Sequence, residues 1–411
     1  MQGFSFSRTP SVISGNGKVA LLPAKAAAYG KTALLVTGGA FLQKSGILDL
    51  LLRAFKDHGI EVCHRQVSGE PSPERVDKIA GEFSPRQIDV VIAIGGGSVI
   101  DAGKAVAAMI GKPGSVKDYL EGVGHLQHDG TRLPFIAVPT TAGTGSEATK
   151  NAVLSFCSPH AGFKKSLRHE GLVPDLAVID PILTLPCPTG IAAACGMDAF
   201  TQLFEGFLSP LASPLTDALA LDGLLLAASH IVESCSLSVP AQRICALVQE
   251  PALAEKEFGS FLKARAAMCH ASFLSGIVLA NAGLGIVHGF ASVIGGAFPI
   301  PHGLICGILL APATRKNLAI ARTSENGHQI VARMNHLSGR IQEKPFPDMA
   351  SDPEKLCEII EDWACRLKIG KLSDAGISTD HLAGIAAKSQ AKTNPVELSF
   401  EDRLEILCSA M

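Results

Sequence analysis

Four side chains between positions 198 and 302 could together bind a metal ion. Asp198 and Gln202 are one helical turn apart, so they would share one face of a helix. His288 lies in an apolar stretch, and His302 follows fourteen positions later in a segment rich in Pro and Gly. A carboxylate and two imidazoles suit Fe(II) or Zn(II) and leave coordination positions open for a substrate oxygen. Taken singly, each histidine could be a hydrogen-bonded core residue, but their shared context favours a metal site.

A run of glycines in the first half of the chain is a candidate for binding a pyrophosphate. A buried, β-rich segment leads directly into Gly95-Gly96-Gly97-Ser98, and a helical pattern follows. Glycines at such a turn let the backbone approach a phosphate, whose charge is stabilised by free N–H groups and the helix dipole. Ser98 would cap this helix, with Asp101 completing a weak capping box. The alternative is a tight turn that binds no ligand.

A second glycine-rich turn favours the phosphate-binding interpretation. It follows another expected strand and reads Pro139-Thr140-Thr141-Ala142-Gly143-Thr144-Gly145-Ser146-Glu147. Thr144 and Glu147 match a capping box. Two such turns at the same end of one parallel sheet can flank one dinucleotide. We therefore expect the hydroxyl groups of this turn to donate to a phosphate or a ribose, the candidates being Thr140, Thr141, Thr144 and Ser146.

Helices and strands must position these candidate sites. The hydrophobic pattern predicts that they form two domains. Short β-rich runs alternate with helical patterns over residues 31–180, which indicates a mostly parallel, doubly wound sheet covered on both faces. After Pro181 the pattern is helical. We expect an α/β dinucleotide-binding domain over residues 1–184 and an all-α domain for metal and substrate over residues 185–411. The strands are expected over 32–37, 60–67, 89–94, 133–138 and 176–180, and the first helices over 47–56, 73–83 and 99–110.

Composition excludes several other classes of function. The 36 Lys and Arg nearly balance the 38 Asp and Glu, so no global field would hold nucleic acid or an anionic membrane surface. Eleven Cys with no Cys-x-x-Cys pair fit reduced thiols in a cytoplasm, and the first ten residues contain no apolar signal region. The apolar stretch 272–300 carries Asn281 and His288, so we expect a buried central helix rather than a membrane span. The polar segment 343–354 reads as a surface loop.

Together these motifs, in this order, resemble those of the iron-containing, or group III, alcohol dehydrogenases, which share the dehydroquinate synthase-like fold. The resemblance covers essentially the whole chain and extends to Lys104 and to Asn394-Pro395 near its end. It implies a metal-dependent NAD(P)(H) alcohol dehydrogenase or aldehyde reductase. Hydride would pass between the nicotinamide and a small alcohol or aldehyde whose oxygen is bound by the metal. A homodimer is also expected.

The same resemblance implies roles for individual residues. The glycine triplet would bind the cofactor pyrophosphate, the Thr-rich turn would line the cofactor cleft, and Lys164 would reach the cofactor or its phosphates. Residues matching Asp198, His288 and His302 would bind the metal.

Two positions depart from the family pattern in the metal site. The family usually has a histidine at the position of Gln202, whose neutral amide oxygen is a weak ligand. We therefore expect weaker metal binding, with zinc or a metal-poor state as alternatives to iron. A second family histidine, linked to proton relay, is replaced by Ser292. Either Ser292 or a chain of waters would carry the alcohol proton.

Two other functions fit the same motifs. A dehydroquinate synthase-like lyase would use its cofactor only transiently, although residues 283–303 look more like the alcohol dehydrogenase branch. A nucleotide-binding relative could have lost its chemistry through Gln202 and Ser292.

The first expected strand predicts which cofactor is preferred. NAD-preferring members often carry an acidic residue after this strand to bind the ribose 2′-hydroxyl, whereas this chain has Gly38 and Gly39 there. Without that carboxylate a 2′-phosphate meets no repulsion, and Lys44 is a candidate partner for its charge. We expect kcat/KM to be higher with NADPH than with NADH, and a clear preference for NADH would contradict this interpretation.

Overall fold

The computed structural model describes residues 3–156, 162–325, 327–342 and 352–411. Its first half forms a six-stranded sheet in the order β1-β8-β5-β4-β2-β3, in which all neighbouring strands are parallel. The chain adds β3 on one side of β2 and then crosses to build β4, β5 and β8 on the other side. This reversal is the switch point of a doubly wound sheet, as predicted. The six strands are β1 Ser11–Ser14, β2 Thr32–Gly38, β3 Glu61–Val67, β4 Val90–Gly95, β5 Phe135–Pro139 and β8 Leu176–Ile179.

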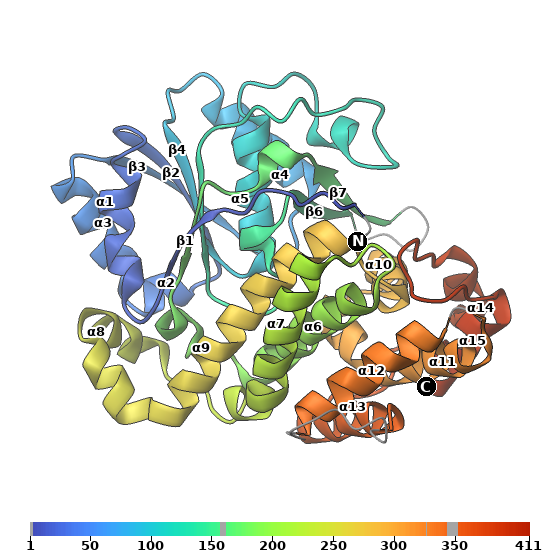
Figure 1. Cartoon of the computed structure of the whole chain (residues 1–411). Coiled ribbons are helices and arrows are strands. Elements are labelled where there is room, and N and C mark those ends of the chain that lie inside the picture. Colours follow the sequence, from blue (N-terminus) through green and yellow to red (C-terminus); the bar gives the residue numbers. More distant parts are fainter. Residues whose placement is uncertain (1–2, 157–161, 326, 343–351) are drawn as a thin grey trace.

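Both faces of the sheet are covered because consecutive residues of its central strands, whose side chains point to opposite faces, are apolar. Leu34 and Val36 of β2 pack in one cluster with α4 and α5, whereas Ala33 and Leu35 pack in another with α1 and α3. The second cluster also contains residues of α8 and the start of α9, so the helical half covers part of the sheet. Figure 1 shows this layering around the sheet. The helices of this half are α1 Leu22–Ala26, α2 Phe41–Lys44, α3 Ile47–Asp57, α4 Pro73–Phe83 and α5 Gly97–Met109.

All five expected strands are present, and three further strands were missed. β1 lies at the sheet edge with mostly exposed side chains, so it lacks the apolar signal of a buried strand. β6 (Asn151–Phe156) and β7 (Phe163–Arg168) form a separate antiparallel pair. The polar residues of β7 mask its pattern, because only one of its faces is buried.

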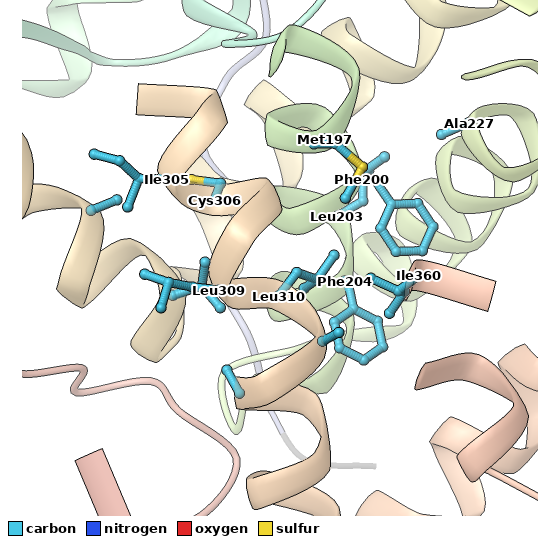
Figure 2. Close-up of a cluster of buried hydrophobic side chains, with 14 of the residues drawn as sticks. Met197, Phe200, Leu203, Phe204, Ala227, Ile305, Cys306, Leu309, Leu310 and Ile360 are labelled. Atoms are coloured by element: carbon cyan, nitrogen blue, oxygen red, sulfur yellow. The ribbon is translucent and has the colours of Figure 1, made fainter. Parts of the chain in front are cut away.

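The second half is helical throughout the part of it that the structure describes. Its core lies between α6, α7, α9, α11 and α13, and Figure 2 shows Phe200 and Phe204 of α6 packed near Leu310 and Ile360. The Trp363 ring meets Phe200 edge to face, with 4.9 Å between centroids. The segment expected to be a surface loop falls between α12 and α13, and its residues 343–351 lie outside the described part of the chain. The helices are α6 Thr189–Leu208, α7 Pro214–Ser234, α8 Ile244–Gln249, α9 Pro251–Ala282, α10 Ile286–Ala297, α11 His302–Thr323, α12 His328–Ile341, α13 Glu354–Arg366, α14 Thr379–Lys388 and α15 Phe400–Ser409.

The apolar stretch 272–300 is not the single central helix that the pattern predicts. It comprises the end of α9 and the whole of α10, which meet at a bend of 100°. Gly283 follows α9 with a φ of 74°, a conformation that favours glycine and ends the helix. Three segments could cross a membrane by length and composition, namely this bent pair, α7 and α11; the apolar window is 33% buried inside the protein in α7 and 67% buried in α11. The bend places His288 at the start of a new helix.

A contact between two glycines joins the Thr-rich turn to α9. A Cβ atom on Gly276 would lie 2.2 Å from the carbonyl oxygen of Gly145, and Gly145 N–H donates to Ser272 Oγ at 3.3 Å. Gly145 itself has a φ of 60°. The absence of side chains therefore lets the turn touch the helix backbone directly. This contact holds the second candidate cofactor turn against the helical half.

Replacing Gly276 with Ala should destabilise the protein despite the better helix propensity of Ala. The new methyl group must displace backbone, so we expect the free energy of unfolding in urea to fall by about 1–3 kcal/mol. Gly259→Ala is the matched control, since Gly259 lies on the same helix with no atom within 4 Å of an added Cβ. The control should gain up to about 1 kcal/mol. Equal stabilisation of both variants would contradict the close contact.

Candidate metal and cofactor site

Four ligand-type side chains from three helices converge in the helical half. Asp198 lies in the middle of α6, His288 in the first turn of α10, and His302 and Cys306 one turn apart at the start of α11. Asp198 Oδ1 lies 3.4 Å from His288 Nε2 and 3.8 Å from His302 Nε2. One ligand atom from each of the four residues falls within 4.8 Å of all the others. The predicted trio of Asp198, His288 and His302 is therefore brought together.

This cluster has the electrostatic properties of a cation site. Asp198 is buried, and its Oδ1 atom has no hydrogen-bond partner among the described residues. Burial alone would raise the pKa of Asp198, but the neighbouring His288 and His302 lower it, so the carboxylate stays charged. Burial lowers the pKa of His302 to about 4, which keeps that imidazole neutral. A buried, charged carboxylate oxygen without a partner beside a neutral imidazole is the donor set that a divalent ion requires.

Glu205 orients His288 from the opposite side of its ring. The Nδ1–H group of His288 donates to Glu205 Oε2 at 2.7 Å, which leaves Nε2 facing Asp198. The other carboxylate oxygen of Glu205 accepts the Val287 N–H at 2.7 Å, at the start of α10. Burial would disfavour a charged His288, but Cys306, Asp198 and Glu205 raise its pKa well above the usual value. Negative surroundings of this kind also favour a bound cation.

The two departures from the family pattern lie in different surroundings. Gln202 is buried next to Asp198, and its Oε1 atom accepts a hydrogen bond from Ser275 Oγ at 2.7 Å. The amide oxygen proposed as a ligand is thus already engaged, and metal binding by Gln202 stays a prediction. Ser292 lies one turn after His288 on α10 and is exposed. Its position leaves its hydroxyl group accessible to water.

The glycine turn after β4 packs closely against its neighbours. Added Cβ atoms on Gly38 and Gly95 would each lie within 2.6 Å of Val99 side-chain atoms. Packing against Val99 therefore requires both glycines, whether or not a ligand is bound. A Cβ on Gly97 would lie 2.5 Å from Thr144 Oγ1. The turns after β2, β4 and β5 therefore meet at the switch point of the sheet, where open α/β sheets bind their ligands.

The caps of these turns differ from the expected ones. Helix α5 begins at Gly97 with Gly96 as its N-cap, so Ser98 lies inside the first turn, and the expected Ser98–Asp101 capping box is wrong. Gly96 has no side chain with which to cap α5, which leaves the first N–H groups of this helix available to an anion. Gly145, with positive φ, caps the short helix Ser146–Ala148, so a Thr144–Glu147 box is also wrong.

The remaining candidate cofactor residues divide into structural and open ones. Asp101 is buried on α5 and accepts the Val153 N–H at 3.2 Å, and burial raises its pKa to about 6. Thr144 donates to Ser146 Oγ at 3.0 Å, which braces the Thr-rich turn. Thr140 and Thr141 are only partly buried. The backbone N–H of Thr140 donates to the Gly95 carbonyl, which ties the two turns together.

Lys164 lies on β7 and is engaged with a carboxylate. Its Nζ atom donates to Glu70 Oε1 at 2.5 Å, and its side chain is 12% exposed. A Cβ on Gly295 of α10 would lie 3.6 Å from Lys164 Cδ, so the lysine packs beside the helix that carries His288. A role in cofactor binding would require exchange of this ion pair.

The cofactor turns and the metal cluster adjoin each other. A Cβ on Gly143 would lie 2.7 Å from the Cβ of Cys195, which precedes Asp198 by three residues on α6. A Cβ on Gly303 would lie 3.1 Å from Asp198 Cβ, so the start of α11 also meets α6 at this point. The Thr-rich turn therefore ends against the helix turn that leads to the metal cluster.

Two family models match almost the entire chain. The model of iron-containing alcohol dehydrogenase covers residues 9–181, and that of the C-terminal part of the Fe-containing alcohol dehydrogenase family covers residues 192–411. The chain belongs to the iron-containing alcohol dehydrogenase family. It is thus an enzyme of an oxidoreductase family, as its motifs predicted.

Individual members of this family are similar over most of their length. "Probable alcohol dehydrogenase EutG" of Escherichia coli is 29% identical, over 99% of this chain and 94% of the relative. The "NAD-dependent methanol dehydrogenase" of Bacillus methanolicus is 28% identical, over 79% of this chain and 78% of the relative. The crystal structure of a 1,3-propanediol oxidoreductase matches 100% of both chains with a TM-score of 0.82 and 27% identity. The two-part fold is therefore that of iron-containing alcohol dehydrogenases.

Sequence reasoning missed two residues of this cluster. Cys306 follows His302 by four residues, a spacing that puts both on one helix face, but it was grouped with the scattered thiols. Glu205 follows Asp198 by seven residues, two helical turns along α6. In both cases the helical spacing from a proposed ligand was the available signal.

Removing the Glu205 carboxylate should weaken metal binding without removing a ligand. Loss of a partner that orients a histidine ligand typically costs about 10–100-fold in metal affinity. We expect Glu205→Ala to show this loss in competition with a chelator, and Glu205→Gln to show a smaller one because its amide oxygen can still accept from His288. Glu233→Ala, at an exposed site on α7, is the control. Unchanged affinity in Glu205→Ala would remove Glu205 from the site.

Proposed function

We propose that the chain is a metal-dependent NAD(P)(H) alcohol dehydrogenase that interconverts a small alcohol and its aldehyde. The observation that carries the proposal is the buried cluster of Asp198, His288 and His302, adjoining two glycine-rich turns at the switch point of the sheet. The family membership supports the reaction type. The two relatives are named as a probable alcohol dehydrogenase and a methanol dehydrogenase, and the solved structure as a 1,3-propanediol oxidoreductase, which supports a small alcohol as substrate.

The residues of the chain would bind the cofactor and the ion, orient the metal ligands and exclude water from them. The uncapped start of α5 would bind the cofactor pyrophosphate, while Asp198, His288 and His302 would hold the ion. When bound, the nicotinamide supplies hydride exchange, and the divalent ion supplies Lewis-acid polarisation of the substrate oxygen. The Glu205 carboxylate keeps His288 Nε2 turned inward. Burial of Asp198 and His288 keeps water from competing for their ligand atoms.

The proton of the alcohol needs a separate route to solvent. Ser292 is exposed one turn after His288, so its hydroxyl group or a water beside it would pass this proton. A hydroxyl group has no basic form near neutral pH, so Ser292 would relay a proton rather than store it.

We further propose NADP(H) as the preferred cofactor, an intracellular location in the cytoplasm and a homodimer. The support for NADP(H) is the Gly38-Gly39 pair after β2, which leaves no carboxylate to repel a 2′-phosphate. The Bacillus methanolicus relative is named as NAD-dependent, so the two cofactors must be compared directly. Balanced charge supports a small molecule as the partner rather than nucleic acid or a membrane.

One alternative has specific support. A relative that binds nucleotide without turnover would fit the engaged amide oxygen of Gln202 and the serine at the proton-relay position. Metal analysis of the purified protein together with turnover of a panel of short aldehydes separates the two functions. Net oxidation of NAD(P)H in the same assay also excludes a lyase that uses its cofactor transiently.

Replacing His302 or His288 with Ala should nearly abolish turnover while the protein remains folded. The charge stabilisation that the site supplies is commonly worth several kcal/mol, equivalent to a loss of at least about 100-fold in kcat/KM. His270→Ala is the matched control, because His270 is exposed on α9, where it pairs with Asp222. Oxidation of NADPH and NADH by short aldehydes is followed by absorbance. Full activity in His302→Ala would reject the metal role.

A further inference from the structure

Cys306 is placed differently from the other buried cysteines of the described chain. Its Sγ atom lies 3.9 Å from His288 Nε2, the nitrogen that faces Asp198. Cys357, by contrast, is buried on α13, and Cys269 faces the hydroxyl group of Thr184. A buried cysteine ordinarily acts as a small apolar residue. Cys306 also belongs to the apolar core (Figure 2), but its sulfur lies next to the ligand atoms of the metal cluster.

Three of the six ligand–ligand separations in this cluster are close to those of a tetrahedral metal site. Ligands at about 2.0–2.1 Å from zinc, arranged tetrahedrally, lie about 3.4 Å from each other, and a sulfur at about 2.3 Å lies about 3.6 Å from a nitrogen. The observed separations are 3.4 Å and 3.8 Å from Asp198 Oδ1 to the two histidines and 3.9 Å from His288 to the sulfur. These three separations are within a few tenths of an ångström of the tetrahedral values, and all the ligand atoms of the cluster lie within 4.8 Å of one another.

Helix geometry explains why the sulfur reaches this point. His302 and Cys306 are four residues apart at the start of α11, so their side chains lie on the same face, toward α6 and α10. Gly303, between them, allows α11 to approach the backbone of α6, where its Cβ would lie 2.2 Å from the Ala194 carbonyl oxygen. One helix thus delivers two ligand atoms to the same centre.

Gln202 is the residue that a fourth ligand would have to replace. Its oxygen is bound by Ser275 Oγ, and a neutral amide adds no charge to balance a divalent ion. A thiolate adds a full negative charge and a soft donor atom. Asp198 with two imidazoles and a thiolate is a donor set that favours tetrahedral zinc.

We infer that Cys306 is the fourth protein ligand of the resident metal and that the site therefore prefers Zn(II) to Fe(II). The inference rests on the proposed function only in assuming that a metal binds between Asp198, His288 and His302. The thiol proton is released to solvent when the sulfur binds the ion. The substrate oxygen would then be admitted by expansion to five-coordination, as catalytic zinc sites allow.

Cobalt substitution tests this ligand directly, without any measurement of turnover. The full-length protein is stripped with a chelator, reloaded with Co(II), and its absorption spectrum recorded. A thiolate ligand produces a sulfur-to-cobalt charge-transfer band in the near ultraviolet, which nitrogen and oxygen ligands do not. We expect the band in the unsubstituted protein and in Cys357→Ala, and its loss in Cys306→Ser and Cys306→Ala. Cys306→Ser changes only one atom, so it keeps the fold if the larger truncation does not.

Zinc affinity gives the second readout. Because even an orienting partner is worth about 10–100-fold, loss of a direct ligand should weaken zinc binding at least about 100-fold in competition with a chelator. Cys357→Ala should bind zinc as the unsubstituted protein does. Equal loading with both metals in competition, or a preference for Fe(II), would overturn the zinc preference.

The outcomes separate this inference from the proposed function. Co(II) binding that requires His302, in a cobalt protein whose spectrum has no sulfur-to-cobalt band, would show that Cys306 is not a ligand. The metal site itself would stand. The same holds if the band survives in Cys306→Ser. If neither Co(II), Zn(II) nor Fe(II) binds the unsubstituted protein, both the inference and the metal-dependent function fail.

Discussion

The charge of Asp198 is the constraint on which the arrangement of the helical half depends. A carboxylate buried between α6, α10 and α11 is costly unless positive charge or hydrogen bonds compensate it. Two imidazole nitrogens lie within 3.8 Å of its oxygen, yet that oxygen forms no hydrogen bond among the described residues. The three helices therefore direct ligand atoms toward a common point between them, and these atoms do not use up their hydrogen-bonding capacity on one another. Glu205 lies one step further from this point, and its hydrogen bond holds His288 in the orientation that leaves the point open.

Close backbone contacts, made possible by glycine, hold this centre beside the cofactor turns. Gly145 touches α9 at Gly276, Gly143 touches α6 at Cys195, and Gly303 brings α11 onto α6. Each contact replaces side-chain packing by direct approach of the main chain, which leaves little freedom in distance. The metal cluster and the switch point of the sheet belong to different halves of the chain, so their separation is set by these contacts.

The fold was largely predictable because its signals are local. Buried parallel strands are continuous apolar runs, and all five expected ones were found, whereas the exposed edge strand β1 and the half-polar pair β6 and β7 carry no such signal. The single central helix expected over residues 272–300 is broken at Gly283, because composition reports apolar burial but not the direction of the chain after a glycine. The caps were wrong for the same reason: positive φ at Gly145 and the extended backbone at Gly96 decide where each helix begins.

By itself the sequence determined the family, the two-part architecture and the identities of Asp198, His288 and His302. These follow from residue type, order and spacing along the chain, which can be read without knowing any distance in space. Only the tertiary structure decided which further groups meet them. Cys306 and Glu205 reach His288 only because α6, α10 and α11 pack together, and the same packing lets Ser275 Oγ donate to the oxygen of Gln202, whose metal binding stays a prediction. Coordination depends on distances of a few ångströms between distant segments, and that information exists only once the chain has packed.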